Sequence, residues 1–255
     1  LKGAFAKTLG NVDIDYIKWD MKRNMTEVYS PSLPPERQGE AAYRYMLGVY
    51  DLFRWFNENF PNVMIENCSG GGGRYDLGMM KYSTQIWASD NTSPIHRTFI
   101  QHGSTFGFPT SVMSCHVGNH KGCIEEPRKL DYRFRVAMNG PLGYEFDVLS
   151  ASDRVKNTIS EQIKEYRTYE ELILRGEFFR LLDPSACGRY AYYFADKETN
   201  ASELLLSFLQ NEGDEREREF KLKLSAADAS ADYVDTISGE RFSGAELKKG
   251  ITAKS

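Results

Sequence analysis

Two aspartates, Asp20 and Asp90, stand out because each follows an apolar run that ends in polar residues. The runs, Val12 to Ile17 and Gln85 to Ala88, are typical of buried β-strands, and parallel α/β folds and barrels build their sites at such strand ends. Paired carboxylates beside a sugar bond are the usual apparatus of glycoside hydrolysis. We therefore predict that both carboxylates serve one carbohydrate site. A strand end capped by a solvated carboxylate is the simpler alternative.

Aromatic and cationic residues accompany both carboxylates. Lys18 and Trp19 directly precede Asp20, and Trp87 stands three residues before Asp90. An aromatic ring offers a large flat apolar face. Such a face stacks well on a sugar ring, so Trp19 and Trp87 are predicted to line the site.

A run of four glycines, Gly70 to Gly73, follows Cys68 and Ser69 after another apolar run, Val63 to Ile65. Glycine allows backbone N–H groups to approach a ligand closely. A nucleotide phosphate loop is disfavoured, because GxGxxG would require glycine at Tyr75 and no GK[ST] sequence is present. A plain flexible loop remains the alternative to a ligand-binding turn.

The segment from Cys115 to Cys123 carries two thiols and the imidazoles of His116 and His120. Its spacing matches neither a zinc finger nor a zinc knuckle. We expect these side chains to pack the loop and to hydrogen-bond sugar, and we expect no metal ion there.

Strands and helices alternate along the first part of the chain, which predicts an α/β fold with a parallel sheet or barrel. Short β runs separated by turns follow Pro184 and predict an antiparallel β-sandwich. We place the domain boundary near Asp183, giving domains 1–183 and 184–255. Helices are predicted at Leu1 to Gly10, Gly39 to Pro61, Pro94 to Gly103, Pro127 to Met138 and from Ser152; further strands are predicted at Thr110 to Met113, Leu142 to Phe146, Tyr190 to Phe194, Leu204 to Leu209, Phe220 to Leu224 and Tyr233 to Ile237.

Composition sets the broad class. The chain has 255 residues, of which 41% are hydrophobic and 27% charged, as in an ordinary globular protein. The net charge of -4 gives no electrostatic case for binding nucleic acid or an anionic membrane. No apolar run approaches the roughly 20 residues that span a bilayer. The four cysteines are too irregularly spaced for a disulfide scaffold, so we expect reduced thiols and a cytoplasmic location.

Three stretches read YIKWDM from Tyr16, CSGGGGRYD from Cys68 and WASDNT from Trp87. In this order and spacing they resemble glycoside hydrolase family 36, the bacterial retaining α-galactosidases with relatives among raffinose synthases. The resemblance covers most of residues 1–183 and, more loosely, the β module. It implies a partial (β/α)8 barrel, about strands 4 to 8, followed by the start of a C-terminal β-sandwich.

The resemblance also implies residue roles. Asp20 would be the nucleophile and Asp90 the general acid/base. The residues implied to bind or line the galactose site are Lys18, Cys68, Gly70, Gly71 and Trp87.

The activity implied is hydrolysis of terminal α-linked galactose from oligosaccharides such as melibiose and raffinose, by double displacement and without a cofactor. A galactosyl transferase of the raffinose-synthase kind and a non-catalytic carbohydrate-binding protein remain the alternatives. The resemblance favours a homo-oligomer. We also expect this chain to be a fragment that is inactive alone, because about five β-α units precede the β module where a closed barrel has eight.

Three positions depart from the family pattern. Lys22 stands where asparagine is common, Ser93 where aspartate is common, and His96 where an acidic residue is usual. These departures bear on leaving-group preference and loop structure and leave the reaction class unchanged.

Overall fold

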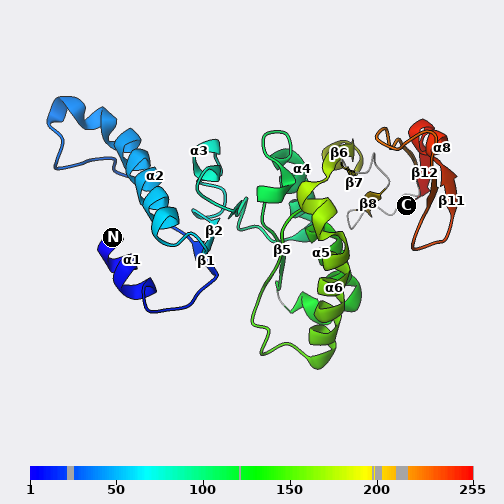
Figure 1. Ribbon diagram of the computed structural model, residues 1–255, viewed down its shortest axis with the longest axis horizontal. Helices are drawn as coiled ribbons and strands as arrows, with labels where there is room; N and C mark the ends of the chain where they lie inside the picture. Colours follow the sequence, from blue (N-terminus) through cyan, green and yellow to red (C-terminus); the bar gives the residue numbers. More distant parts are fainter. Residues whose placement is uncertain (22–25, 121, 197, 199–202, 211–217, 255) are drawn as a thin grey trace. The chain divides into compact units, whose positions relative to one another are not determined.

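In the computed structural model, which describes residues 1–21, 26–120, 122–196, 198, 203–210 and 218–254, the chain divides into two compact units (Figure 1). The first unit is residues 1–90 and the second is residues 91–255. Both predicted catalytic aspartates belong to the first unit.

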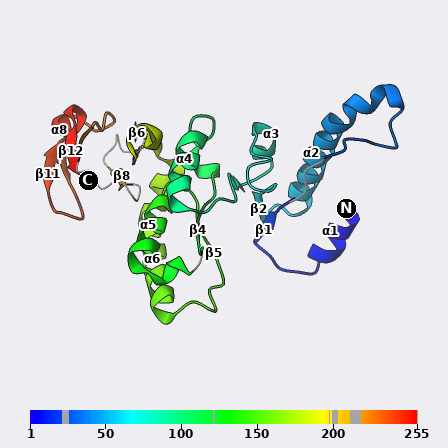
Figure 2. The same cartoon turned by 180° about the vertical axis from the view of Figure 1, so that it is seen from behind.

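The first unit is built on a small parallel sheet, in which β1 pairs with β2 and β2 with β3. Helix α2 lies against this sheet in both views (Figures 1 and 2). The elements are α1 (Lys2–Leu9), β1 (Tyr16–Trp19), a 3-10 helix (Pro35–Glu40), α2 (Ala41–Asn59), β2 (Met64–Asn67), α3 (Leu77–Met80) and β3 (Gln85–Ile86).

The core of this unit forms where the apolar face of α2 meets the sheet. Phe53 and Phe56 of α2 are buried and pack with Ile65 of β2, Ile86 of β3 and Met79 of α3. Their three-residue spacing puts the two phenylalanines on one side of the helix. Burying a side chain of this size contributes about 1.5–3 kcal/mol. This packing fixes the sheet whose ends carry the candidate site.

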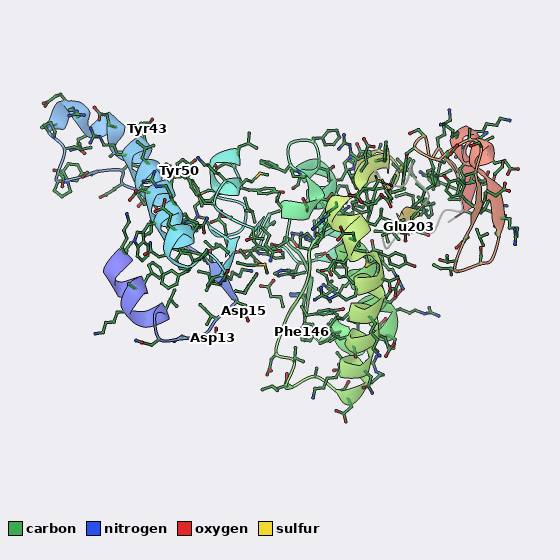
Figure 3. The ribbon with its side chains drawn as sticks, in the orientation of Figure 1. Asp13, Asp15, Tyr43, Tyr50, Phe146 and Glu203 are labelled. Carbon is green, nitrogen blue, oxygen red and sulfur yellow. The ribbon has the colours of Figure 1, made fainter. Side chains whose placement is uncertain are left out.

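Strand β1 is shorter than predicted and begins at Tyr16 instead of Val12. Asp13 and Asp15 therefore lie on the connection between α1 and β1 (Figure 3). The ladder starts where the Met64 N–H donates to the Asp15 carbonyl at 2.8 Å, because that is where the partner strand begins. Alternation in the sequence was therefore an incomplete guide to pairing.

The described residues of the second unit form a parallel pair, β4 with β5, and three antiparallel sheets. Helices α5 and α6 lie side by side in both views, and Arg135 forms an ion pair with Glu165 between them (Figure 2). The elements are α4 (Pro94–Ser104), a 3-10 helix (Thr110–Val112), β4 (Cys115–Gly118), a 3-10 helix (Cys123–Glu125), α5 (Pro127–Ala137), β5 (Leu142–Glu145), α6 (Asp153–Arg175), β6 (Glu177–Leu182), α7 (Pro184–Cys187), β7 (Arg189–Ala195), β8 (Leu204–Gln210), β9 (Glu219–Leu222), β10 (Asp232–Val234), β11 (Arg241–Ser243), α8 (Gly244–Lys249) and β12 (Ile251–Lys254).

The strand predicted at Thr110 to Met113 is wrong. Pro109 precedes a single 3-10 turn over Thr110–Val112, and the strand begins at Cys115. Thr110 and Met113 are buried, so the apolar run correctly indicated a core segment, although the predicted strand conformation was wrong. A short apolar run cannot by itself distinguish a strand from a helical turn.

The helices and later strands of this unit follow the prediction more closely. Ser152 caps α6, where its side chain accepts a hydrogen bond from the Val155 N–H. Strands β7 to β10 lie within about three residues of their predicted positions. Strand β6, which pairs antiparallel with β7, had no counterpart in the sequence analysis. The boundary near Asp183 and the β-sandwich beyond it stay predictions. In the described part of the chain, every helix is too short or too polar to cross a bilayer.

Candidate active site

Asp20 follows β1 directly and faces the glycine-rich turn that follows β2. The Gly70 N–H donates to Asp20 Oδ1 at 3.1 Å. Gly70 and Gly71 have φ of +55° and +85°, a left-handed conformation that glycine adopts without steric cost. The turn is closed by a hydrogen bond from the Gly73 N–H to the Ser69 carbonyl. The glycine run therefore presents a backbone donor to the first aspartate.

The same turn contacts the second aspartate through its neighbouring residue. A Cβ atom on Gly71 would lie 2.9 Å from the Asp90 backbone nitrogen and 3.1 Å from the Ser89 Cα. Such distances mean that the two backbones touch. Since Gly70 and Gly71 are consecutive, the turn brings the segments that carry Asp20 and Asp90 to one place.

Trp87 fixes the side chain of Asp90. Its Nε1–H donates to Asp90 Oδ1 at 3.1 Å, while its ring is buried. Lys18 Nζ lies over the same ring, 4.6 Å from its centroid. A cation over an indole face is electrostatically favourable. Lys18, Trp87 and Asp90 thus form a connected group at the ends of β1 and β3.

Glu66, which sequence reasoning missed, completes this group from β2. Its carboxylate is fully buried and lies 3.0 Å from Lys18 Nζ. The Tyr16 hydroxyl donates to its other oxygen, and Gln85 Nε2 lies 3.4 Å from that oxygen. Strand pairing was the missing information, because Glu66 is opposite Lys18 only in the observed register.

Cys68 and Arg74 are the buried residues next to the glycine turn. Cys68 is buried, and burial together with the neighbouring Asp20 carboxylate raises the pKa of its thiol to about 11. Arg74 is also buried and donates to the carbonyls of Trp19 and Cys68. One guanidinium therefore ties the end of β1 to the start of the glycine turn.

Trp19 is placed differently from the other predicted residues. Its ring stacks on Phe53 at 4.3 Å between centroids and also packs against Phe5 and Phe56. Successive side chains of a strand point to opposite faces, so Trp19 faces α2 while Lys18 faces the opposite side. The structure does not bring this ring to the group of Lys18, Trp87 and Asp90, and its stacking on sugar stays a prediction.

The Cys115 to Cys123 segment belongs to the second unit. Cys115 is fully buried in β4, whereas His120 is exposed. His116 packs against Gly143 and lies 3.4 Å from a Glu145 oxygen. Among the described residues no set of three histidine, cysteine or acidic side chains is arranged to hold a metal ion. The expectation that metal does not bind here stays a prediction.

The three residues that depart from the family pattern lie in different surroundings or outside the described part of the chain. Ser93 is the N-cap of α4, although its side chain makes no capping hydrogen bond. His96 is exposed on the first turn of that helix. Lys22 lies outside the described residues.

The chemistry of this arrangement is that of two carboxylates held by fixed donors. Asp20 accepts a backbone N–H and Asp90 accepts an indole N–H, so one oxygen of each carboxylate is oriented. The Lys18 ammonium pairs with the buried Glu66 carboxylate and lies over the Trp87 ring that donates to Asp90. Such a set can perform nucleophilic attack and proton transfer on one substrate.

Comparison with known proteins places the chain in a family. The sequence model of the Melibiase family matches residues 1–176. Alpha-galactosidase AgaA of Geobacillus stearothermophilus is 38% identical over 231 residues, which are 89% of this chain and 31% of that protein. Alpha-galactosidase 1 of Pediococcus pentosaceus is 36% identical over 240 residues, or 94% of this chain and 32% of that protein. The chain thus spans about a third of the length of these relatives.

Solved structures agree with the sequence comparison. The crystal structure of the glycoside hydrolase family 36 α-galactosidase AgaA matches with a TM-score of 0.89 at 35% identity, over 99% of this chain and 35% of that one. A variant of AgaA in complex with raffinose matches with the same TM-score of 0.89. The chain therefore belongs to the Melibiase family, with α-galactosidases of glycoside hydrolase family 36 among its relatives.

Proposed function

We propose that this chain carries the catalytic carboxylates of a retaining α-galactosidase, which removes terminal α-linked galactose from oligosaccharides such as melibiose and raffinose. The observation that carries the proposal is the turn at Gly70 and Gly71, which contacts the segments of both Asp20 and Asp90. The names of the relatives support the substrate class, and a relative solved with raffinose supports an oligosaccharide substrate.

In the proposed mechanism Asp20 is the nucleophile. The Gly70 N–H donates to Oδ1, which stabilises the ionised carboxylate that attacks the anomeric carbon. Attack forms a β-galactosyl ester and breaks the bond to the leaving oxygen. Lys18, on the same strand, hydrogen-bonds hydroxyl groups of the sugar.

Asp90 is the general acid and then the general base. An indole N–H can only donate, so Oδ1 accepts from Trp87 and the transferable proton resides on Oδ2. That proton goes to the leaving oxygen in the first step. In the second step Asp90 takes a proton from water, which attacks the ester and gives galactose with retained configuration.

The finer fold belongs to the same proposal. Residues 1–183 are proposed to be part of a (β/α)8 barrel, about strands 4 to 8, and residues 184–255 the start of a β-sandwich. The chain is proposed to act within a polypeptide of its relatives' length, called the full-length enzyme below. That enzyme is proposed to be a homo-oligomer, which light scattering would test, and to be cytoplasmic, which cell fractionation would test. It is also proposed to need no cofactor, and elemental analysis would test whether it holds a metal ion.

The decisive experiment is azide rescue in the full-length enzyme, with an activated aryl α-galactoside as substrate. Asp20→Ala should lose turnover and form β-galactosyl azide, because azide replaces the nucleophile. Asp90→Ala should form α-galactosyl azide, because azide replaces water in the second step. The exposed Asp13, on the connection before β1, supplies the matched control Asp13→Ala, which should behave as wild type (Figure 3).

Three outcomes would count against the proposal. The same azide anomer from both variants would contradict the assignment of the two roles. Galactosyl transfer to sucrose in preference to water would identify a transferase. Galactose binding without turnover by the wild type would identify a carbohydrate-binding protein.

A further inference from the structure

Three residues on neighbouring strands form a row across the sheet of the first unit. In the parallel register Lys18 on β1 lies opposite Glu66 on β2, and Glu66 lies opposite Gln85 on β3. Tyr16 lies on the same face of β1 as Lys18, two residues away. The row therefore converges on the Glu66 carboxylate from both sides.

Glu66 is an unusual residue for this position, because its side chain has no exposed surface. Burying a carboxylate is costly unless it is paired and hydrogen-bonded. Here Lys18 Nζ lies 3.0 Å from Oε1, and the Tyr16 hydroxyl donates to Oε2. A site that maintains so costly a group in a core is typically using it to orient something else.

The group that Glu66 orients is the Lys18 ammonium. Lys18 Nζ sits between the Glu66 carboxylate and the face of Trp87, at 3.0 Å and 4.6 Å. The Lys18 side chain retains 31% of its exposure, so the ammonium is held on one side and accessible on another. An ammonium has three donors, and one ion pair leaves donors for a ligand.

We infer that Glu66 is a positioning residue for substrate recognition, which fixes the Lys18 ammonium so that it donates to a sugar hydroxyl. The inference rests on the proposed function, in which Lys18 binds galactose. Glu66 acts through Lys18 and does not itself touch the substrate. A long lysine side chain without this anchor would have to be ordered by each substrate, which weakens binding.

The test is a double-mutant cycle in the full-length enzyme, with variants Glu66→Gln, Lys18→Met and both together. Glu66→Gln keeps the shape and removes the charge, so kcat/KM should fall about tenfold, mainly through KM. The double variant should match Lys18→Met within about twofold, because Glu66 is proposed to act on the substrate through Lys18. Tyr16→Phe, which removes a hydrogen bond from the same carboxylate but keeps the ion pair, should cost less than about threefold. Melting temperatures identify any variant that fails to fold.

Several results would overturn the inference. One is a Glu66→Gln enzyme with wild-type KM. Another is a double variant whose loss in kcat/KM is the product of the two single losses. The third is a loss in kcat/KM for Tyr16→Phe as large as that for Glu66→Gln. If the wild type binds galactose without hydrolysing an aryl α-galactoside, the proposed function fails. In that case the Kd for galactose is measured by calorimetry for the same variants. A double variant that binds galactose as weakly as Lys18→Met supports positioning, whereas a double variant whose loss of affinity is the product of the two single losses overturns it.

Discussion

The glycine at position 71 offers a sharp test of how the turn places the acid/base. A Cβ atom there would lie 2.9 Å from the Asp90 nitrogen, and ordinary contact begins near 3.4 Å. In Gly71→Ala the two backbones must therefore separate by about 0.5 Å, taken from the difference of those distances. Displacement of a catalytic group by about 1 Å can cost about 100-fold in rate, so half of that displacement predicts a loss of about tenfold in kcat/KM.

Gly70→Ala is the matched control. Both glycines have positive φ, so alanine at either position carries the left-handed backbone cost of about 1–2 kcal/mol. At Gly70, however, an added Cβ meets no atom of the described residues within 4 Å, and the N–H to Asp20 is retained. The two variants thus share the backbone strain and differ in the contact with Asp90.

The assay uses the full-length enzyme and aryl α-galactosides whose leaving phenols span a range of pKa. Asp90 is proposed to protonate the leaving oxygen, so the loss in Gly71→Ala should grow as the leaving group becomes poorer. Gly70→Ala should show no such trend. If both variants lost activity equally for every substrate, the turn would not position Asp90 and the reasoning would be wrong.

Three further predictions test other contacts. Trp87→Phe removes the indole donor to Asp90 at 3.1 Å and should lower kcat for poor leaving groups about 3- to 30-fold, whereas an unchanged leaving-group dependence would contradict that role. Ser152→Ala removes the cap of α6 and should lower the free energy of unfolding by about 1 kcal/mol in urea titration, with activity unchanged; no loss of stability would refute the capping assignment. Burial raises the pKa of Cys68 to about 11, so iodoacetamide should label it more slowly than Cys123 at pH 8 and faster as the pH approaches 11; rapid labelling at pH 8, detected by mass spectrometry of peptides, would refute its burial.

The sequence predicted the elements of the site better than their contacts. Asp20 and Asp90 were recognised from the polar ends of apolar runs, and the structure brings their segments together at the glycine turn. The motif did not predict the packing of Trp19. Its ring stacks on Phe53 while its neighbour Lys18 points to the opposite face of β1, and its stacking on sugar stays a prediction.

Glu66 could not be predicted for a different reason. Its role depends on which residue of β1 lies opposite it, and parallel pairing between strands about 50 residues apart leaves no local pattern. The strand prediction at Thr110 to Met113 was wrong for a third reason. The apolar run correctly indicated burial, but it did not indicate the backbone conformation, which is a 3-10 turn. The local sequence therefore predicted candidate functional residues, whereas it did not predict the register between strands that are distant in sequence.

The register of β1 against β2 also limits how this protein can vary over evolution. Lys18 pairs with Glu66 on one face, while Trp19 fills the core on the other. Loss or gain of one residue inside β1 would exchange these faces, moving a charge into the core and an indole into the site. Homologous enzymes should consequently differ in length in the connections around β1 and keep the four positions from Tyr16 to Trp19 free of insertions and deletions.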